Sequence, residues 1–331
     1  MASVFSFSIN GSTSLYTPNI RSSSSFYKPI VAKLGPNQSY WASIEADIEA
    51  HLKKAITIRP TEPVFEPMHY LIFSTPKSTA PALCVAACEL VGGDRAEAMH
   101  AASAIHLMHV AAYTHQHMQV GPGPVVGREL GQNSKPGVGL QYKELGLARI
   151  NEPKIVHKYG PNMELLTGDG IMPLAIELLA NAMSPARKNS DKILRVITEV
   201  THAMGSKGLV DGLYREVEWT RSGDGNEELF DYVCKKKEGE IHACGATCGA
   251  ILGDGNDEEI ERLKKYGLYV GMIQGIINGS IGRNYNKKRM EKKVEELRVL
   301  AMKELNANFK GKKVVGQIAS LIEDFGVSIK L

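Results

Sequence analysis

The chain of 331 residues has no long apolar run, little net charge and few cysteines. No window approaches the roughly 18 unbroken apolar residues that a spanning helix needs, so the sequence predicts no membrane partner. Lysine and arginine number 39 against 36 acidic residues, and a net charge of +3 is too small for a nucleic-acid-binding protein. Five cysteines are too few for a disulfide framework in a chain this long, which favours a reducing compartment.

Acidic residues are also missing from the N-terminal segment, because none precedes Glu45. The same segment is rich in serine, with the run Ser22–Ser25, and carries the basic residues Arg21, Lys28 and Lys33. A serine-rich, basic and acid-free N-terminus is typical of an organelle transit peptide. We therefore predict a disordered transit peptide over residues 1–38. Its composition alone does not separate a plastid from a mitochondrial address, and an untargeted disordered tail is the alternative.

Beyond Trp41 the chain predicts a helical protein, because apolar residues recur every three or four positions and no stretch alternates as a strand would. We expect an all-α fold with one domain over residues 39–331. Helices are expected just after Trp41 and over residues 83–90, 96–118, 164–182, 192–204, 229–252, 258–277, 287–305 and 313–325.

Two segments are expected to interrupt the helices. Four prolines should leave residues 58–77 mostly as loop or broken helix. Residues 119–147 are dense in glycine and proline and predict a long loop, a length usual only for functional or disordered segments. Asn256, followed three residues later by Glu259, predicts the start of the helix over 258–277.

Several blocks of sequence occur in the order typical of one enzyme family. They are Leu83–Gly93, His109, Leu165–Gly170, Gly208–Gly212 and Gly249–Gly255. Together they resemble the trans-isoprenyl diphosphate synthases, and the plant geranylgeranyl diphosphate synthases in particular. The resemblance covers nearly all of the chain beyond Trp41, and it implies the single-domain helical bundle of isoprenoid synthases.

The same resemblance implies magnesium chemistry whose ligands this chain lacks. In that family two Asp-rich motifs hold Mg²⁺ ions, which bind the substrate diphosphate and stabilise the departing pyrophosphate. This chain has no Asp-Asp dipeptide. It reads His-Gln-His-Met at residues 115–118 and Ile-Asn-Gly-Ser-Ile-Gly at 277–282, where the motifs belong. We therefore expect no metal or other cofactor bound by this chain, no catalytic residue of its own, and Mg²⁺ in a partner subunit.

The cations expected at the diphosphate site are reduced as well. The family's Gly-Gly-Lys-Arg-x-Arg-Pro reads here as Thr75–Pro81, which keeps Lys77 but replaces both arginines. The family's Lys-Thr pair reads Lys237-Glu238, and its Gly-Gln pair reads Gly212-Leu213. Serine and alanine do not imitate the planar fork that arginine offers to phosphate oxygens. Lys77 and Lys237 are thus residual diphosphate-site positions, and we predict a chain that is inactive alone.

Two Cys-x-x-x-Cys pairs, Cys84 with Cys88 and Cys244 with Cys248, lie in separate predicted helices, where this spacing puts both sulfurs on one face. Three interpretations come from the residues alone: buried small side chains, a four-cysteine zinc site, or a strained disulfide within a pair. The double pattern resembles the non-catalytic small subunits of plant geranyl diphosphate synthases, which implies that these four residues form a partner interface. Cys234 is expected to be structural.

Polar residues near the missing metal sites have open interpretations. The histidines of the 96–118 helix and its end are expected to be packed or solvated, with metal binding by His106 and His109, or by His115 and His117, as the alternative. Asp169 is expected to have a structural or capping role, and the charges of residues 289–298 to form a solvated helix face.

The resemblance implies a regulatory subunit in plastids that binds a geranylgeranyl diphosphate synthase-like large subunit, as a heterodimer or heterotetramer. It is expected to shift the product toward geranyl diphosphate, with the predicted loop 119–147 as a candidate lid. The alternatives are a recruiter or activator that leaves the product length unchanged, and an active prenyltransferase with unorthodox metal binding.

Overall fold

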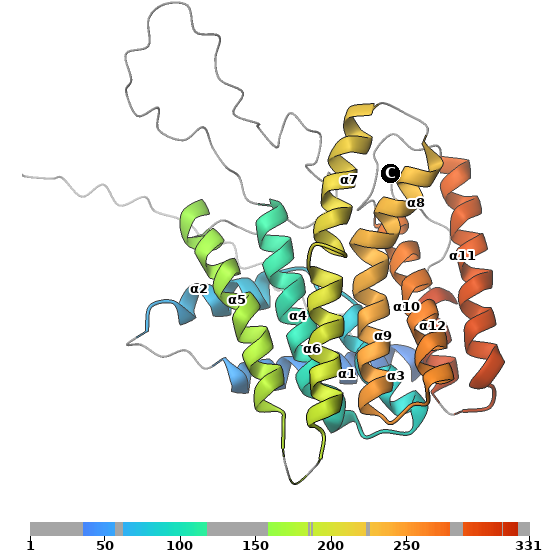
Figure 1. Ribbon diagram of the computed structural model, residues 1–331, viewed down its shortest axis with the longest axis horizontal. Coiled ribbons are helices and arrows are strands. Elements are labelled where there is room, and N and C mark those ends of the chain that lie inside the picture. The colour runs from blue at the N-terminus through green and yellow to red at the C-terminus, as the bar shows by residue number, and fades with distance from the viewer. Residues whose placement is uncertain are drawn as a thin grey trace, which may run out of the picture. The chain divides into compact units, whose positions relative to one another are not determined.

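The computed structural model describes residues 36–56, 62–117, 158–184, 186, 188–222, 226–278, 287–312 and 314–323. These residues form helices and turns without a strand (Figure 1), which confirms the predicted all-α class. The helices are α1 (Pro36–Ala55), α2 (Phe65–Ser74), α3 (Ala80–Val91), α4 (Arg95–His117), α5 (Pro161–Asn181), α6 (Ser190–Met204), α7 (Leu209–Ser222), α8 (Glu227–Cys234), the π-helical turn η2 (Lys235–Gly239), α9 (Glu240–Leu252), α10 (Asp257–Ile277), α11 (Lys287–Asn308) and α12 (Val315–Glu323). None of them is long and apolar enough to cross a membrane.

The predicted transit peptide over residues 1–38 and the predicted loop over 119–147 fall wholly or mostly outside the described residues, and both stay predictions. Helix α1 already begins at Pro36. The compact unit to which every described residue belongs spans Gly35–Leu331.

The structure differs from the sequence prediction at two helices. The expectation of mostly loop over 58–77 is wrong at its centre, where α2 covers Phe65–Ser74. Pro67 lies in the first turn of α2, where its missing N–H leaves no helical hydrogen bond unmade, and Leu71 and Ile72 are buried behind it. Helix α7 was not predicted at all, because Gly212 within its first turn lowers the helix propensity of this segment.

The predicted helix over 229–252 is interrupted by the π-helical turn η2, which separates α8 from α9. Such a turn inserts an extra residue and re-aims the side chains beside it, and it is frequent at functional sites. The predicted start of α10 is confirmed in detail. Asn256 accepts a hydrogen bond from the backbone N–H of Glu259, and the Glu259 carboxylate accepts one from the backbone N–H of Asn256.

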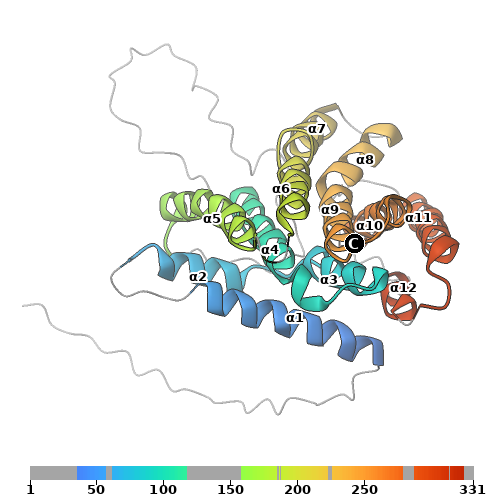
Figure 2. The same ribbon diagram turned by 60° about the horizontal axis from the view of Figure 1, so that its bottom comes forward.

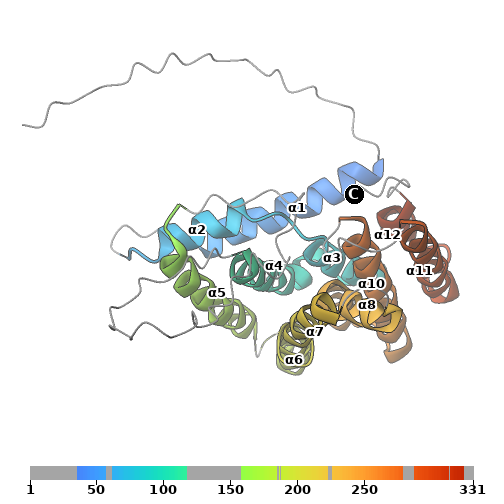
Figure 3. The same ribbon diagram turned by 90° about the horizontal axis from the view of Figure 1, so that it is seen from above.

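The helices form three layers in the view of Figure 3. Helices α1 and α2 lie on one side of α3, α4 and α5, and α6 to α10 lie on the other side. Helix α9 is central, with neighbours α3, α4, α6 and α10 (Figure 2). Tyr266 of α10 is fully buried and donates a hydrogen bond of 2.6 Å to the carbonyl oxygen of Ile318, which ties α10 to α12.

The contact between α3 and α9 is unusually close, because glycine recurs every fourth residue along α9. A Cβ atom at Gly245, Gly249 or Gly253 would lie 2.4, 1.9 or 2.7 Å from the carbonyl oxygen of Ala80, Cys84 or Cys88 respectively. Real Cβ atoms essentially never come within 3.0 Å of such a neighbour. The glycines therefore set the distance between the two helices that carry the cysteine pairs.

Candidate functional site

The end of α4 occupies the position of the first Asp-rich motif, and its side chains contact protein groups. His117 stacks on Tyr113 with ring centroids 3.8 Å apart, and its Nδ1 donates to the Tyr113 carbonyl oxygen at 2.8 Å. His115 Nε2 lies 3.2 Å from Asp169 Oδ1 of α5, directly over Gly168, where a Cβ would lie 2.5 Å from that nitrogen. Asp169 thus lies beside a histidine of the neighbouring helix, and the structural or capping role expected for it stays a prediction.

The other histidines of α4 that were metal-ligand candidates hold the segment around α2. His106 Nε2 donates to the Ile72 carbonyl oxygen at 3.1 Å, and His109 Nε2 donates to the Pro76 carbonyl oxygen at 3.0 Å. Burial lowers the pKa of His106, so its imidazole is neutral at pH 7. Among the described residues no group of three or more His, Cys, Asp or Glu side chains could hold a metal ion.

Lys77 is half-exposed and lies between two carboxylates of α1. Its Nζ is 3.4 Å from Glu45 Oε2 and 3.4 Å from Glu49 Oε2. These three residues line the rim of a hollow of about 70 Å³ between α1, α2, α3 and α4, whose interior is mostly apolar. Small-molecule sites usually enclose about 300–1,000 Å³, so this hollow is small for a ligand.

Lys237 of η2 is buried and paired within the chain. Its side chain is 2% exposed, and its Nζ lies 2.8 Å from Oε1 and 2.7 Å from Oε2 of Glu216 on α7. Lys237 also lines a second hollow, of about 30 Å³, together with His109, Tyr113 and Gln116 of α4. The structure therefore places the two predicted lysines in separate hollows, each beside a carboxylate of this chain.

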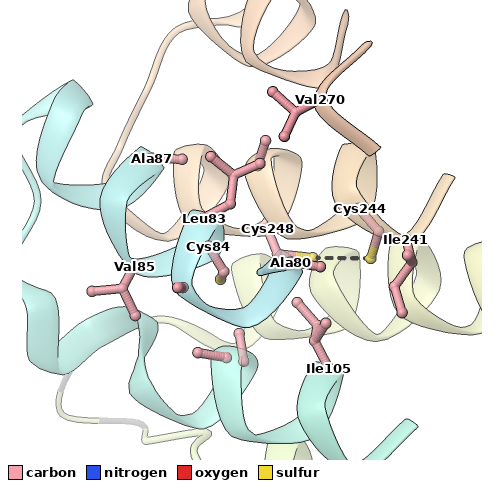
Figure 4. Packing of buried hydrophobic residues seen from close by; sticks show 14 of the residues in the cluster. Ala80, Leu83, Cys84, Val85, Ala87, Ile105, Ile241, Cys244, Cys248 and Val270 are labelled. Carbon is pink, nitrogen blue, oxygen red and sulfur yellow. Dashed lines mark hydrogen bonds between the residues drawn. The ribbon is translucent and has the colours of Figure 1, made fainter. Parts of the chain in front are cut away.

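Cys84, Cys244 and Cys248 lie in the core where α3, α4 and α9 meet (Figure 4), and Cys88 belongs to the same buried cluster. Cys84, Cys88 and Cys248 are 0% exposed and Cys244 is 4% exposed. All four are free thiols, and Cys244 Sγ lies 3.8 Å from Cys248 Sγ, far beyond the roughly 2.05 Å of a disulfide.

The cysteine environments favour neutral thiols. Burial raises the pKa of Cys84 well above its ordinary value and that of Cys88 to about 12. The Cys244–Cys248 hydrogen bond, followed by burial, raises the pKa of Cys248. Zinc binds the thiolate form, so this geometry matches buried small side chains better than a zinc site. Cys234 lies in the core, where burial raises the pKa of its thiol in the same way.

The sequence of this chain is similar to known proteins of one family. Residues 147–296 match the polyprenyl synthetase family. The chain is 47% identical to a Cannabis sativa protein named "heterodimeric geranylgeranyl pyrophosphate synthase small subunit 2, chloroplastic", over 86% of this chain and 91% of that one. The chain belongs to the polyprenyl synthetase family. This confirms the resemblance drawn from the sequence blocks.

Two solved structures are similar in both sequence and fold. The geranyl diphosphate synthase small subunit of Antirrhinum majus is 47% identical, with a TM-score of 0.71 over 88% of this chain and all of that chain. A chain of a mint heterotetrameric geranyl pyrophosphate synthase is 46% identical, with a TM-score of 0.69 over 86% of this chain and 99% of that one. The predicted isoprenoid synthase fold is therefore confirmed.

The family generally uses Mg²⁺, and the residues that the structure describes do not fit that ion. Mg²⁺ prefers carboxylate and water oxygens in octahedral geometry. Among the described metal-ligand candidates, His106, His109 and His117 direct a ring nitrogen at a backbone carbonyl oxygen. His115 Nε2 lies beside Asp169.

Two features of the site were missed by sequence reasoning. Glu216 is 21 positions from Lys237, and only the packing of the unpredicted helix α7 brings it there. The outward side of α5 exposes large apolar side chains, which a search for buried helical faces overlooks. The sequence does carry a signal for the exposed apolar side chains of α5, because apolar residues occur on most sides of this helix.

Proposed function

We propose that this chain is a non-catalytic regulatory subunit of a heteromeric prenyltransferase. It binds a geranylgeranyl diphosphate synthase-type large subunit and shifts that subunit's product toward geranyl diphosphate for monoterpene synthesis. The observation that carries the proposal is that both lysines left at the diphosphate positions already contact carboxylates of the chain itself. A substrate diphosphate would have to displace those carboxylates without help from arginine or a metal site.

The names of the relatives support the partner. Relatives 47% and 44% identical are named small subunits of heterodimeric synthases, and the mint structure is heterotetrameric. A protein 28% identical to this chain is named a large subunit. The proposed assembly is accordingly a heterodimer or heterotetramer in which the large subunit holds Mg²⁺ and performs the condensation.

The proposed location is the plastid. The Cannabis sativa and Arabidopsis thaliana relatives are all named chloroplastic. The acid-free, serine-rich segment over residues 1–38 would then be the transit peptide. Import of a fusion that carries only this segment into isolated chloroplasts tests the assignment, and import into mitochondria alone would contradict it.

A surface for the large subunit is available on α5. We call the four exposed apolar residues of this helix the α5 outer face: Met163 is 47% exposed, Leu165 39%, Leu166 63% and Met172 36%. A contiguous exposed apolar patch marks an interaction site, and we propose that these four side chains belong to one. We propose that the large subunit covers this face, because relatives 47% and 46% identical to this chain are named as parts of heteromers.

The predicted role of Cys84, Cys88, Cys244 and Cys248 at the interface remains a proposal. Their side chains offer almost no surface in the chain alone, so any contribution would come through the spacing of α3 and α9.

Leu166→Glu is expected to abolish co-purification with the large subunit while the far-ultraviolet circular dichroism stays helical. The matched control is Val299→Glu, on α11 at 61% exposure, which should leave the complex intact. Loss of the complex in Cys84→Ala and Cys248→Ala, but not in Leu166→Glu, would move the interface to the cysteine helices.

A product assay tests the function itself. The chain without residues 1–38 is supplied with dimethylallyl and isopentenyl diphosphates and Mg²⁺, alone and with a plastid geranylgeranyl diphosphate synthase. We expect no turnover alone, and a shift from twenty-carbon to ten-carbon product in the complex. Turnover by the chain alone would refute the non-catalytic assignment.

A second candidate function has its own support. Three relatives, 47%, 44% and 30% identical, are named for geranylgeranyl rather than geranyl product. A recruiter or activator of this kind predicts a complex whose twenty-carbon product forms faster and is not shortened. The same assay separates the two candidates by product length.

A further inference from the structure

Helix α11 exposes apolar side chains on the side that faces away from the rest of the chain. Val299 is 61% exposed and lies on the opposite side of the helix from Leu297 and Ala301, and Leu300 beside it is 40% exposed. The side chains of α11 that pack on the core recur every three or four residues: Met290, Val294, Leu297, Ala301 and Leu305. Val299 and Leu300 therefore form no part of the core of this chain.

Charged side chains of opposite sign flank Val299 along the same side of α11. Glu295 and Glu296 precede Val299 by four and three residues, and Lys303 follows it by four, so all three lie within one helical turn of it on its own face. The side chain of Glu295 is 68% exposed, that of Glu296 is 53% exposed, and Lys303 is exposed as well. We call these five residues, with Leu300, the α11 outer face.

The α11 outer face is complementary to itself when two such helices run antiparallel. A two-fold axis at Val299 brings the residues one turn before it in one copy against the residue one turn after it in the other. The glutamates of each copy then face Lys303 of the other, and this pairing occurs twice. Two parallel helices would instead place glutamate against glutamate and lysine against lysine. The apolar side chains lie at the centre of the antiparallel contact and the charges at its rim, as in other protein interfaces.

The position of α11 in the fold leaves this face accessible while α5 is engaged. Within the chain, α11 packs on α10 and α12. In Figures 2 and 3, α11 lies at the opposite edge of the helical unit from α5, with α10 between them. A protein bound to the α5 outer face therefore does not cover the α11 outer face.

We propose that the α11 outer face binds the same face of a second copy of this chain, with the two helices antiparallel about a two-fold axis at Val299. The apolar centre is small and the charge pairs at the rim are exposed, so the contact is weak and is weakened further by salt. It needs only copies of this chain and does not depend on the proposed large subunit. Val299→Glu should weaken this contact and still co-purify with the large subunit.

Sedimentation equilibrium of the full chain over a range of concentrations measures the association. In low salt the average mass of the parent chain should rise with concentration from 36.1 kDa toward twice that value. Lys303→Glu places glutamates against one another, and Glu295→Lys with Glu296→Lys places lysines against one another. Each of these variants alone should therefore weaken the dimer by about tenfold or more. An equimolar mixture of the two should recover the dimer, because every charge contact in the mixed pair again joins opposite signs.

The matched control is Lys53→Glu, which makes the same charge change at a side chain of α1 that is 57% exposed, and it should leave the dimer unchanged. A parent chain that stays monomeric at every concentration would overturn the proposal. Association that survives both charge variants unchanged would also overturn it, because the contact would then lie on another surface. Failure of the mixture to recover the dimer, with both variants helical by circular dichroism, would refute the antiparallel pairing. The large subunit is absent from every sample, so a negative result leaves the proposed function standing.

Discussion

Gly249 is the position where the close contact of α3 and α9 makes the sharpest prediction. A Cβ there would lie 1.9 Å from the Cys84 carbonyl oxygen, 2.8 Å from its carbonyl carbon and 3.0 Å from Ala87 Cβ. Ordinary contacts begin near 3.4 Å, so Gly249→Ala forces the two backbones apart by about 1.5 Å at this point. A backbone oxygen inside a helix has no rotamer through which to move aside.

The magnitude follows from two opposing effects. Alanine in place of a helical glycine stabilises by about 1 kcal/mol. Overpacking a dense core costs about 1–3 kcal/mol and more where backbone must move, and here the displaced helix carries ten buried residues. We expect a net loss of about 2 kcal/mol, which lowers the unfolding midpoint by about 4–8 °C.

The matched control is Gly316→Ala in α12, where a Cβ would meet nothing within 4 Å. Its midpoint should stay the same or rise slightly, measured by circular dichroism under the same conditions. A Gly249→Ala variant as stable as the parent would refute the close approach of α3 and α9. It would also remove the spacing argument for the cysteine pairs.

Three further outcomes follow from single contacts. Asn256→Ala should lower the free energy of unfolding by about 1 kcal/mol in urea titration, because the capping box with Glu259 is lost; an unchanged value would show that the cap is dispensable. Tyr266→Phe should cost about 1–3 kcal/mol, because the Ile318 carbonyl oxygen loses its buried donor, and a smaller loss would mean that water replaces the hydroxyl. Burial lowers the pKa of His242 below the ordinary 6.5, so below that pH the unfolded chain binds a proton that the fold excludes, and stability falls as pH decreases. His242→Gln should flatten the dependence of the midpoint on pH below 6.5, and an equally steep dependence would contradict this assignment.

The sequence predicted the fold well where apolar periodicity and capping signals agree. Helix α10 shows both, with Asn256 and Glu259 at its start, and its predicted range differs from the observed one by a single residue. Prediction was wrong at α2, because proline counts against a helix interior but not against a first turn. It missed α7, because the glycine at 212 lowers helix propensity while serving a contact with η2 that only the folded chain reveals.

The site was harder to predict than the fold, because its character depends on contacts between distant residues. Lys77 and Lys237 were predicted as residual diphosphate-site positions and stay predictions, while their carboxylate partners come from α1 and α7. The spacing of Gly245, Gly249 and Gly253 was readable in the sequence, yet its meaning required the position of α3. Pairing across helices is set by tertiary packing, which local patterns do not encode.

The residue that replaces the family's second arginine, Ala80 of α3, takes part in the α3–α9 packing, and its replacement also removes a phosphate ligand. Ala80 stands at the second arginine position of the family pattern, is 0% exposed, and offers its carbonyl oxygen as the surface against Gly245. An arginine at this buried position would have to take its guanidinium to the surface or find a counter-ion, because a charged side chain is almost never fully buried without a partner. The packing of α3 on α9 and the Lys237–Glu216 pair thus involve two of the family's diphosphate positions, and we propose the α5 outer face as the surface that contacts the partner.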